Sequence, residues 1–490
     1  MLRCVVAFAL LLVPTAAQEA LALVGATVHV GDGSPPLLDA VVVVRDGKIT
    51  AVGPAASTKV PDGVRRIDLK GQHLTPGLID THVHYSQTGW VDGRPDAANV
   101  RKDHPYEQAM ADNRAHPERY HRAFLHAGVT AVFDVGGYPW TLELGKQTES
   151  DPLAPHVVAT GALLATFDPG LSLPDAKQFA FPQNADEARI VVTAHKAAGS
   201  AAIKFWYVTR SDDEIKKWSP VLRAIGEQAK HEGLPLVVHA TTLASAKDAV
   251  AAGAALLVHS IEDTVVDEAF VAACKAQGTS YCPTLIVRAG YAMVYAAKLS
   301  DEVSAQLDAV HPTVKERALL TSKLPPRNAR TIAGMEQRLK LQGDTMAKNL
   351  RALRDAGIPI VMGTDAGNPL TLHGPSVFVE MEAMVAAGMT AREVLLAATA
   401  AAARAIGRGD DRAHAAAADL SDHVEPRGRD GRRGRGLGAR PRAALAPRER
   451  PSTTPKPSEP PMKSSVPIVL FVAMAACKQE SKKPVLYLYP

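Results

Sequence analysis

The sequence predicts an α/β protein in which a (β/α)8 barrel follows a small β module. Two observations predict this fold. Eight short apolar runs rich in β-branched residues recur between residues 74 and 367, and mostly Ala-rich helical stretches separate them. Alternation of strand and helix implies parallel strands joined by right-handed crossovers. Eight repeats with almost continuously apolar strands fit a closed barrel better than an open sheet.

The first 17 residues, MLRCVVAFALLLVPTAA, combine one basic residue, Arg3, with a short apolar run and small residues at the end. This layout predicts a signal peptide cleaved near Ala17, and therefore a secreted or periplasmic protein. A buried first strand is the alternative. The apolar run is too short to span a bilayer comfortably.

Residues 18–73 are predicted to form a small β-sandwich module. Runs such as LALVGATVHV and AVVVVRDGKITAVG have the length of strands, and Gly, Asp and Pro lie between them. The pattern changes at residue 74, where the barrel is expected to begin. It is expected to extend to residue 406.

The eight expected barrel strands are GLIDTHVH, VTAVFDVGG, HVVATGALLA, AAIKFWYV, LPLVVHA, ALLVHSIE, TSYCPTL and IPIVMGTDAG. The stretch from about Ser300 to Asp355 is long and helical, which indicates an insertion beside the mouth of the barrel. After the eighth strand, Thr390 and Glu393 have the spacing of a capping box that begins one of the last helices.

Ionisable residues interrupt these apolar strands near their carboxyl ends, where such a barrel places its chemistry. Buried ionisable groups are costly unless they are paired or bind a metal. His82 and His84 end the first strand, and their i, i+2 spacing directs both imidazoles to one face. The complete candidate set is His82, His84, Lys204, His239, His259 and Asp365. The alternatives are structural histidines, a Lys204 that extends to solvent, and an Asp365 that caps a helix.

This order of residues resembles the binuclear, metal-dependent amidohydrolase superfamily. The flanking motifs LTPGLIDTHVH, VHATTLASAKDAVAAG, LVHSIED and GTDAG look like its prolidase- and imidazolonepropionase-like branch, and the resemblance covers about residues 21–406. It implies two divalent metal ions. His82, His84 and Asp365 would hold the more buried ion, and His239 and His259 the more exposed one.

The resemblance also implies that Lys204 is N-carboxylated by carbon dioxide and bridges the two metals together with a hydroxide. Burial favours the neutral amine that this modification requires. Asp365 is the expected catalytic residue, accepting a proton as the hydroxide attacks and passing it to the leaving nitrogen. Zinc is favoured by the His-rich set, and manganese or cobalt also fit.

Substrate-binding residues are predicted less directly. Arg288 follows the seventh strand and is a candidate for binding a substrate carboxylate. Tyr281, Tyr291 and His373 are candidates for lining the mouth. For each of the four, a solvated loop residue is the alternative.

The segment after the barrel departs from the family pattern. Residues 407–461 are rich in Arg, Ala, Gly and Pro, which predicts a disordered basic tail, interpreted as a shifted reading frame. A natural basic extension is the alternative. Residues 462–490 contain MKSSVPIVLFVAMAACKQESKK, which has the layout of a lipoprotein signal and indicates a fusion artefact. A membrane anchor is the rival interpretation, but the apolar core is short of the ~20 residues that a span needs. The strands that usually close the β module are therefore expected to be lost, leaving an unpaired edge.

Charge and motifs together define the predicted function. Residues 407–490 contain 16 basic and 9 acidic residues, a surplus of 7 (16 − 9), so the rest of this +4 chain is mildly acidic. That distribution argues against a nucleic-acid binder. We predict a hydrolase of carbon–nitrogen bonds that acts on a small amide, a dipeptide or a cyclic amide, with a homo-oligomer left open. The alternatives are a mononuclear deaminase of the same fold and an inactive frameshifted product.

Overall fold

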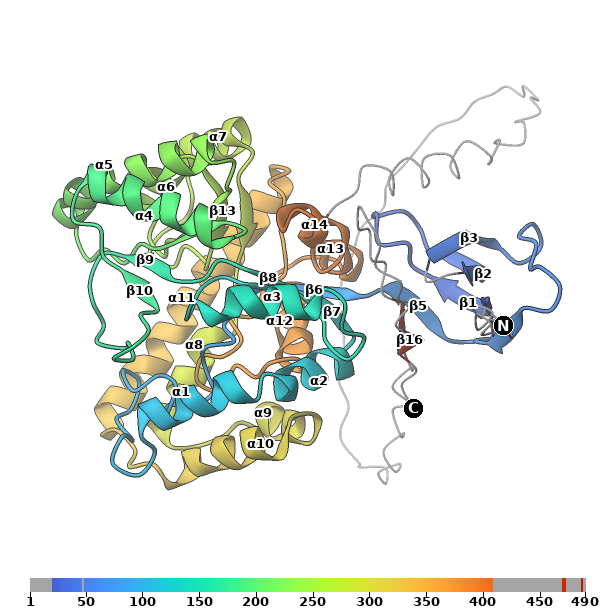
Figure 1. Cartoon of the computed structure of the whole chain (residues 1–490), viewed down its shortest axis with the longest axis horizontal. Helices are drawn as coiled ribbons and strands as arrows, with labels where there is room; N and C mark the ends of the chain where they lie inside the picture. The colour runs from blue at the N-terminus through green and yellow to red at the C-terminus, as the bar shows by residue number, and fades with distance from the viewer. Residues whose placement is uncertain (1–19, 46–47, 409–468, 473–485, 488–490) are drawn as a thin grey trace, which may run out of the picture.

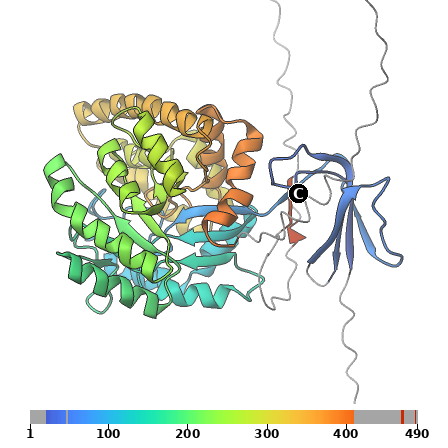
Figure 2. The same ribbon diagram turned by 90° about the horizontal axis from the view of Figure 1, so that it is seen from above.

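The computed structural model describes residues 20–45, 48–408, 469–472 and 486–487 of the 490-residue chain. The predicted signal peptide, residues 1–17, and nearly all of the predicted basic tail, residues 407–461, lie outside these described residues. A large α/β body and a small β module stand side by side (Figures 1 and 2). No helix among the described residues is long and apolar enough to cross a membrane.

The β module is built from β1 (Leu21–Val28), β2 (Leu37–Arg45), β3 (Lys48–Pro54), β4 (Arg65–Asp68) and β5 (His73–Pro76). β1 pairs antiparallel with β2 and parallel with β4 and β5, and β2 pairs antiparallel with β3. The Val-rich β2 is apolar on both faces. Val42 and Val44 pack into one cluster, whereas Val41 and Val43 pack into another, as the two-residue period of a strand requires.

Two short strands from the end of the chain extend this sheet. β15 (Val469–Val472) pairs parallel with β5, and β16 (Leu486–Tyr487) pairs antiparallel with β15. The sequence predicted an unpaired edge at this position, so the structure differs from that expectation. The sequence VLFV of β15 consists of residues that favour strands, which accounts for its pairing with an open edge.

The strands of the body are all paired in parallel, in the orders β6–β7–β8 and β10–β9–β11–β12–β13–β14. Their bounds are β6 (Leu78–Val83), β7 (Val129–Asp134), β8 (His156–Ala159), β9 (Leu163–Ala165), β10 (Phe179–Ala180), β11 (Ile203–Trp206), β12 (Leu236–His239), β13 (Ala254–Val258) and β14 (Ser280–Cys282). The predicted α/β class is confirmed.

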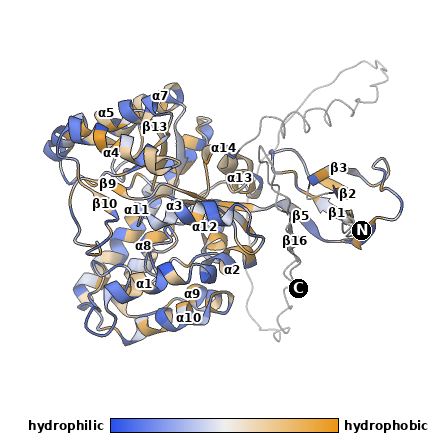
Figure 3. Ribbon diagram, viewed as in Figure 1, coloured by the Kyte–Doolittle hydropathy of each residue, from blue (hydrophilic) through white to orange (hydrophobic). Residues whose placement is uncertain are grey.

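Helices separate and flank these strands. They are α1 (Tyr106–Ala115), α2 (Glu118–His126), α3 (Trp140–Thr148), α4 (Ala185–Ala198), α5 (Asp212–His231), α6 (Leu243–Ala251), α7 (Glu268–Gln277), α8 (Val287–Ala296), α9 (Asp301–Gln306), η1 (Leu307–Ala309), α10 (Pro312–Leu319), η2 (Leu320–Lys323), α11 (Ala329–Asp355), α12 (Ser376–Ala386), α13 (Ala391–Ala397) and α14 (Ala400–Ala405). Helices such as α4 and α5 mix hydrophobic and hydrophilic residues along their length (Figure 3). The predicted capping box is confirmed, because Thr390 and Glu393 cap each other's backbone at the start of α13.

Backbone hydrogen bonds continue beyond these two sheets. Ala201 N donates to Ala159 O (3.0 Å), which links the start of β11 to β8. Val361 N donates to Tyr281 O (3.0 Å), and Thr81 N donates to Met362 O (3.0 Å). The segment around residues 359–366 therefore bridges β14 and β6.

That segment was predicted as the eighth strand, yet it forms only isolated bridges, at Ile360 and Ala366. At the carboxyl end of the segment, the physical reason lies in the backbone. Asp365 has a φ of 63° and Gly367 a φ of 108°, values that no extended strand can contain. The turn brings Asp365 N to within 2.7 Å of His82 O, to which it donates a hydrogen bond.

Candidate metal centre

One cavity of about 220 Å³ collects the ionisable side chains at the carboxyl ends of the parallel strands. The six predicted ligands all line it: His82, His84, Lys204, His239, His259 and Asp365. They come from β6, β11 and β12, and from the residues just after β6, β13 and the segment around residue 360. Their role as metal ligands stays a prediction.

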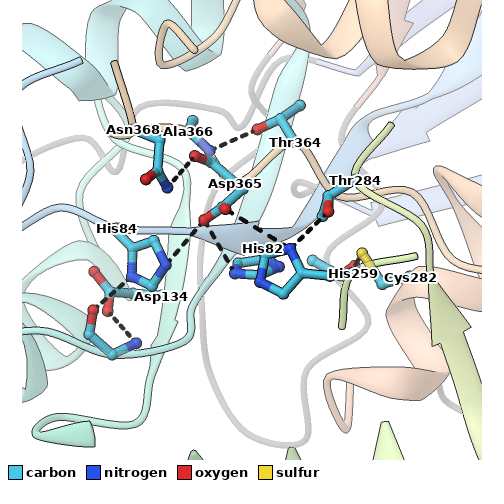
Figure 4. A network of polar contacts seen from close by, with 12 residues as sticks. His82, His84, Asp134, His259, Cys282, Thr284, Thr364, Asp365, Ala366 and Asn368 are labelled. Atoms are coloured by element: carbon cyan, nitrogen blue, oxygen red, sulfur yellow. Dashed lines mark hydrogen bonds and ion pairs between the residues drawn. The ribbon is translucent and has the colours of Figure 1, made fainter. Parts of the chain in front are cut away.

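Asp365 lies at the centre of the cluster (Figure 4). Its Oδ1 lies 3.2 Å from His82 Nε2 and 3.0 Å from His84 Nε2, and its Oδ2 lies 3.9 Å from His259 Nδ1. One possible ligand atom each from His82, His259 and Asp365 falls within 4.8 Å of the others. The ring of His239 meets that of His259 edge-on, with centroids 4.2 Å apart. The geometry therefore supplies nitrogen and oxygen donors around a common volume.

Buried polar atoms without hydrogen-bond partners gather at this point. Lys204 is 1% exposed, and its Nζ has no hydrogen-bond partner among the described residues. The same holds for His82 Nδ1. Unsatisfied buried polar atoms are costly and rare in native proteins. Their concentration in a set of imidazole, amine and carboxylate groups fits the binding of divalent cations.

Burial sets the protonation states in the cluster. It lowers the pKa of His82 to about 3, and it holds those of His239 and His259 well below the usual value. Burial also lowers the pKa of Lys204 to about 7. Neutral imidazole is the form that binds a metal, and a neutral amine is the form that can be carboxylated.

The pKa of Asp365 moves in the opposite direction from that of a solitary buried carboxyl. Burial alone would raise it, but His82, His84 and His259 together hold the pKa well below its usual range. Asp365 is therefore an anion beside His82 and His259, whose rings are neutral.

Surrounding residues, which sequence reasoning missed, orient the cluster. His84 Nδ1 lies 2.6 Å from Gly136 O and donates to this backbone carbonyl, so Nε2 is the ring nitrogen that faces Asp365. His259 Nδ1 lies 2.8 Å from Thr284 Oγ1. Asp80 is fully buried beneath His82 and accepts hydrogen bonds from His82 N (3.2 Å) and Thr364 Oγ1 (2.6 Å).

Backbone strain coincides with the same positions. His259 and Thr284 have φ angles of 76° and 43°, and Asp365 also lies in the left-handed region. Non-glycine residues in this region cost on the order of 1–3 kcal/mol each and tend to cluster at functional sites.

The predicted substrate residues divide into two pairs. Arg288 and Tyr291 line the cavity, where Arg288 Nε donates to Glu262 Oε1 (2.5 Å) and the Tyr291 hydroxyl donates to Asn368 Oδ1 (2.8 Å). Tyr281 and His373 correct the prediction, because neither belongs to the lining of the cavity.

The corrected pair lies behind the site. The Tyr281 hydroxyl accepts a hydrogen bond from Ile261 N (3.0 Å). His373 Nε2 lies 3.1 Å from His84 O, and its ring packs at 3.9 Å against that of Tyr120. Arg94, Gln178 and Trp206 also line the cavity. They were missed because the sequence prediction searched for residue types that bind metals at the ends of strands.

Parallel strands with a buried cluster of ionisable side chains at their carboxyl ends are typical of an α/β enzyme whose site lies at that end of the strands. The sequence profile of the amidohydrolase family matches residues 73–412. The chain therefore belongs to the amidohydrolase family, as the motifs indicated, and is a hydrolase acting on carbon–nitrogen bonds.

Similar proteins with an assigned activity support this assignment. Imidazolonepropionase from Stenotrophomonas maltophilia is 25% identical over 401 residues, which cover 78% of this chain and 84% of the relative. Imidazolonepropionase from Caulobacter vibrioides is also 25% identical, over 406 residues, covering 76% of this chain and 84% of the relative.

Solved structures share the fold. A Xaa-Pro dipeptidase with bound methionine is similar with a TM-score of 0.57 and 19% identity, covering 79% of this chain and 89% of its own. Molinate hydrolase is similar with a TM-score of 0.56 and 20% identity, covering 80% of this chain and 86% of its own.

Proposed function

We propose that the protein is a binuclear metal-dependent hydrolase that cleaves the carbon–nitrogen bond of a small amide, dipeptide or cyclic amide. The observation that carries this proposal is the convergence of six donor-type side chains on one cavity, where Lys204 Nζ and His82 Nδ1 are buried without a hydrogen-bond partner among the described residues. The closed (β/α)8 barrel is part of the proposal. It is supported by parallel pairing on both sheets and by the hydrogen bonds that connect β14 to β6 through residues 359–366.

The donors divide into two groups by their place in the fold. His82, His84 and Asp365 would hold one cation, and His239 and His259 would hold the other. Lys204 would contribute to both sites as a carbamate, which would form if the neutral amine nitrogen bonded to the carbon of carbon dioxide and lost a proton. When bound, divalent cations, with zinc favoured, would polarise the substrate carbonyl and lower the pKa of a water molecule toward neutrality.

The remaining chemistry belongs to side chains of this chain. Asp365 is ionised and faces the cavity, so its carboxylate can accept the proton of the attacking water and return it to the leaving nitrogen. His84 and His259 are held in fixed orientations by Gly136 O and Thr284 Oγ1. Arg288 lies at the wall of the cavity, where it can bind a carboxylate on the substrate.

The test is metal-dependent turnover. The purified full chain is treated with a chelator, restored with zinc, manganese or cobalt, and assayed on N-acyl amino acids, Xaa-Pro dipeptides, cyclic amides and an amino-substituted ring compound. Restoration of hydrolysis by added metal supports the proposal. Release of ammonia from an amino-substituted ring, with no amide cleavage, would favour a mononuclear deaminase instead.

We also propose export from the cytoplasm, on the layout of residues 1–17. Cell fractionation of the full chain tests it, and the amino-terminal sequence of the mature protein should begin near Gln18. Retention of Met1 on cytoplasmic protein would contradict export.

A further inference from the structure

One wall of the cavity is apolar. It consists of Leu163, Leu171, Phe179, Trp206 and Val208, which come from β9, β10, β11 and the adjoining loops. β9 and β10 lie together on one side of the body (Figure 1). This wall, hereafter the apolar wall, takes no part in the chemistry proposed above.

Trp206 joins the apolar wall directly to the candidate metal centre. Lys204 and Trp206 are two residues apart on β11, so both side chains lie on the same face of the strand. The Trp206 ring also meets the His239 ring edge-on, with centroids 6.4 Å apart. A group that rests on Trp206 is therefore next to any amide held at the cluster.

The apolar wall is preformed by buried hydrogen bonds. Gln178 precedes Phe179, and its Nε2 donates to Tyr106 Oη (2.7 Å) and to Leu171 O. The Tyr106 hydroxyl in turn contacts Leu171 O (3.2 Å). The Phe179 ring packs against that of Trp206, with centroids 5.5 Å apart. A rigid apolar surface binds a matching group with little loss of side-chain entropy.

Polar side chains line other parts of the cavity. Arg94, Arg288, Tyr291 and Asn368 come from the segments after β6, after β14 and after Asp365. In the strand order these segments lie away from β9 and β11. The two kinds of surface thus face a bound substrate from different sides.

We infer that the enzyme selects amides carrying a large apolar substituent, aromatic or branched aliphatic, beside the scissile bond, and that the apolar wall determines this specificity. The inference rests on the proposed function and deepens it by naming the substrate class. The cavity of about 220 Å³ exceeds the ~150 Å³ that suffices for a benzene ring in an apolar protein cavity. An aromatic ring and the adjoining amide therefore fit together.

The test compares two substrate series on metal-loaded full chain. One series is N-acetylglycine, N-isovalerylglycine and N-phenylacetylglycine; the other is N-acetylglycine, N-acetylleucine and N-acetylphenylalanine. We expect kcat/KM for the bulky members to exceed that for N-acetylglycine by about tenfold or more in at least one series, since even one methylene in an apolar pocket discriminates 10–200-fold. Trp206→Ala should reduce this ratio about tenfold, and Trp206→Leu should retain part of it.

The matched control is Phe378→Ala. Phe378 is an aromatic residue on α12 that is 43% exposed and does not line the cavity, so the ratio should not change. An unchanged ratio in Trp206→Ala, or a preference for N-acetylglycine, overturns the inference.

Failure of the proposed function has a different signature, which is no metal-dependent turnover of any amide. In that case the apolar wall is tested by calorimetric binding of phenylacetate and acetate to the metal-free chain. Preference for phenylacetate by about tenfold, abolished in Trp206→Ala, supports the wall as a binding site. Equal binding of the two acids overturns it.

Discussion

Asp365 shows how one residue combines strain, charge and position. Its left-handed backbone (φ 63°) directs the carboxylate between His82 and His84, and its N–H is held by His82 O. The strain is tolerated because the surrounding strands fix the backbone on both sides. The result is a carboxylate, 4% exposed, among imidazole rings, an arrangement that a cation stabilises.

We expect Asp365→Asn and His82→Ala each to lower kcat/KM by about 10²–10⁴. Asp365→Asn removes the proposed proton carrier, and both variants alter a proposed metal ligand. The melting temperature of the metal-free chain should change little, since neither variant removes a hydrogen bond on which the fold depends. Steady-state kinetics and thermal unfolding measure the two effects. Asp308→Asn is the control, because the Asp308 side chain is 88% exposed on η1. Near wild-type activity in either site variant would sink the mechanism.

At the scale of elements, helix α12 holds in place the loop after β14, which lies far from it in sequence. Glu380 on α12 is fully buried and accepts hydrogen bonds from Leu285 N (2.9 Å) and Ile286 N (3.1 Å). The preceding residue, Thr284, contacts His259 Nδ1. A helix after the last predicted strand thus holds an imidazole of the candidate centre in place.

We therefore expect Glu380→Ala to weaken zinc binding about tenfold, the effect usual for residues that orient metal ligands. Glu380→Gln keeps one acceptor oxygen and should restore part of the affinity. Competition with a chromophoric chelator measures the affinity, and urea unfolding measures stability separately. Lower stability with unchanged zinc affinity would mean that Glu380 only supports the fold.

A pH-sensitive contact joins two elements of the β module. His29 Nε2, just after β1, lies 3.0 Å from His73 Nδ1 on β5. Burial, His73 and Arg392 all lower the pKa of His29 below its ordinary 6.5. The unfolded chain therefore binds this proton more tightly than the folded chain does, and stability is lost as the pH falls below about 6.5.

We expect His29→Gln to weaken the decline in melting temperature between pH 7 and pH 5. The comparison with wild type isolates His29 from the buried histidines of the body, which also destabilise the fold on acidification. Thermal unfolding across this pH range is the measurement. Parallel curves for the two proteins would show that the His29–His73 contact does not contribute.

At the scale of the whole molecule, the features that could be predicted from the sequence are those that depend on the local pattern of residues. The parallel α/β body follows from the alternation of apolar runs, and the strand-end positions of residues such as His82 and Lys204 follow from spacing. Glu380 could not be predicted, because its role depends on contacts between distant segments. The role of Asp80 also depends on such contacts, although its position two residues before His82 was a usable signal. The eighth strand was predicted, but the turn that interrupts it at Asp365 was not, because tertiary hydrogen bonds and not apolar periodicity set that turn.

The pairing of β15 with β5 leads to a prediction for truncation. Removing residues 409–490 should leave kcat/KM within about twofold, since no described residue of that segment lines the cavity. Amide hydrogen exchange over His73–Pro76 should rise, because β5 loses its neighbour in the sheet. Unchanged exchange would contradict the pairing of β15, and a tenfold loss of activity would contradict its separation from the site.

The most direct test of the central claim is the metal content of the purified full chain, measured by plasma mass spectrometry after equilibration with zinc. The account predicts two zinc ions per chain, and one or fewer in Lys204→Ala, because the bridging group is removed. A single ion in the wild type, or two ions retained in Lys204→Ala, would contradict a binuclear centre built around Lys204.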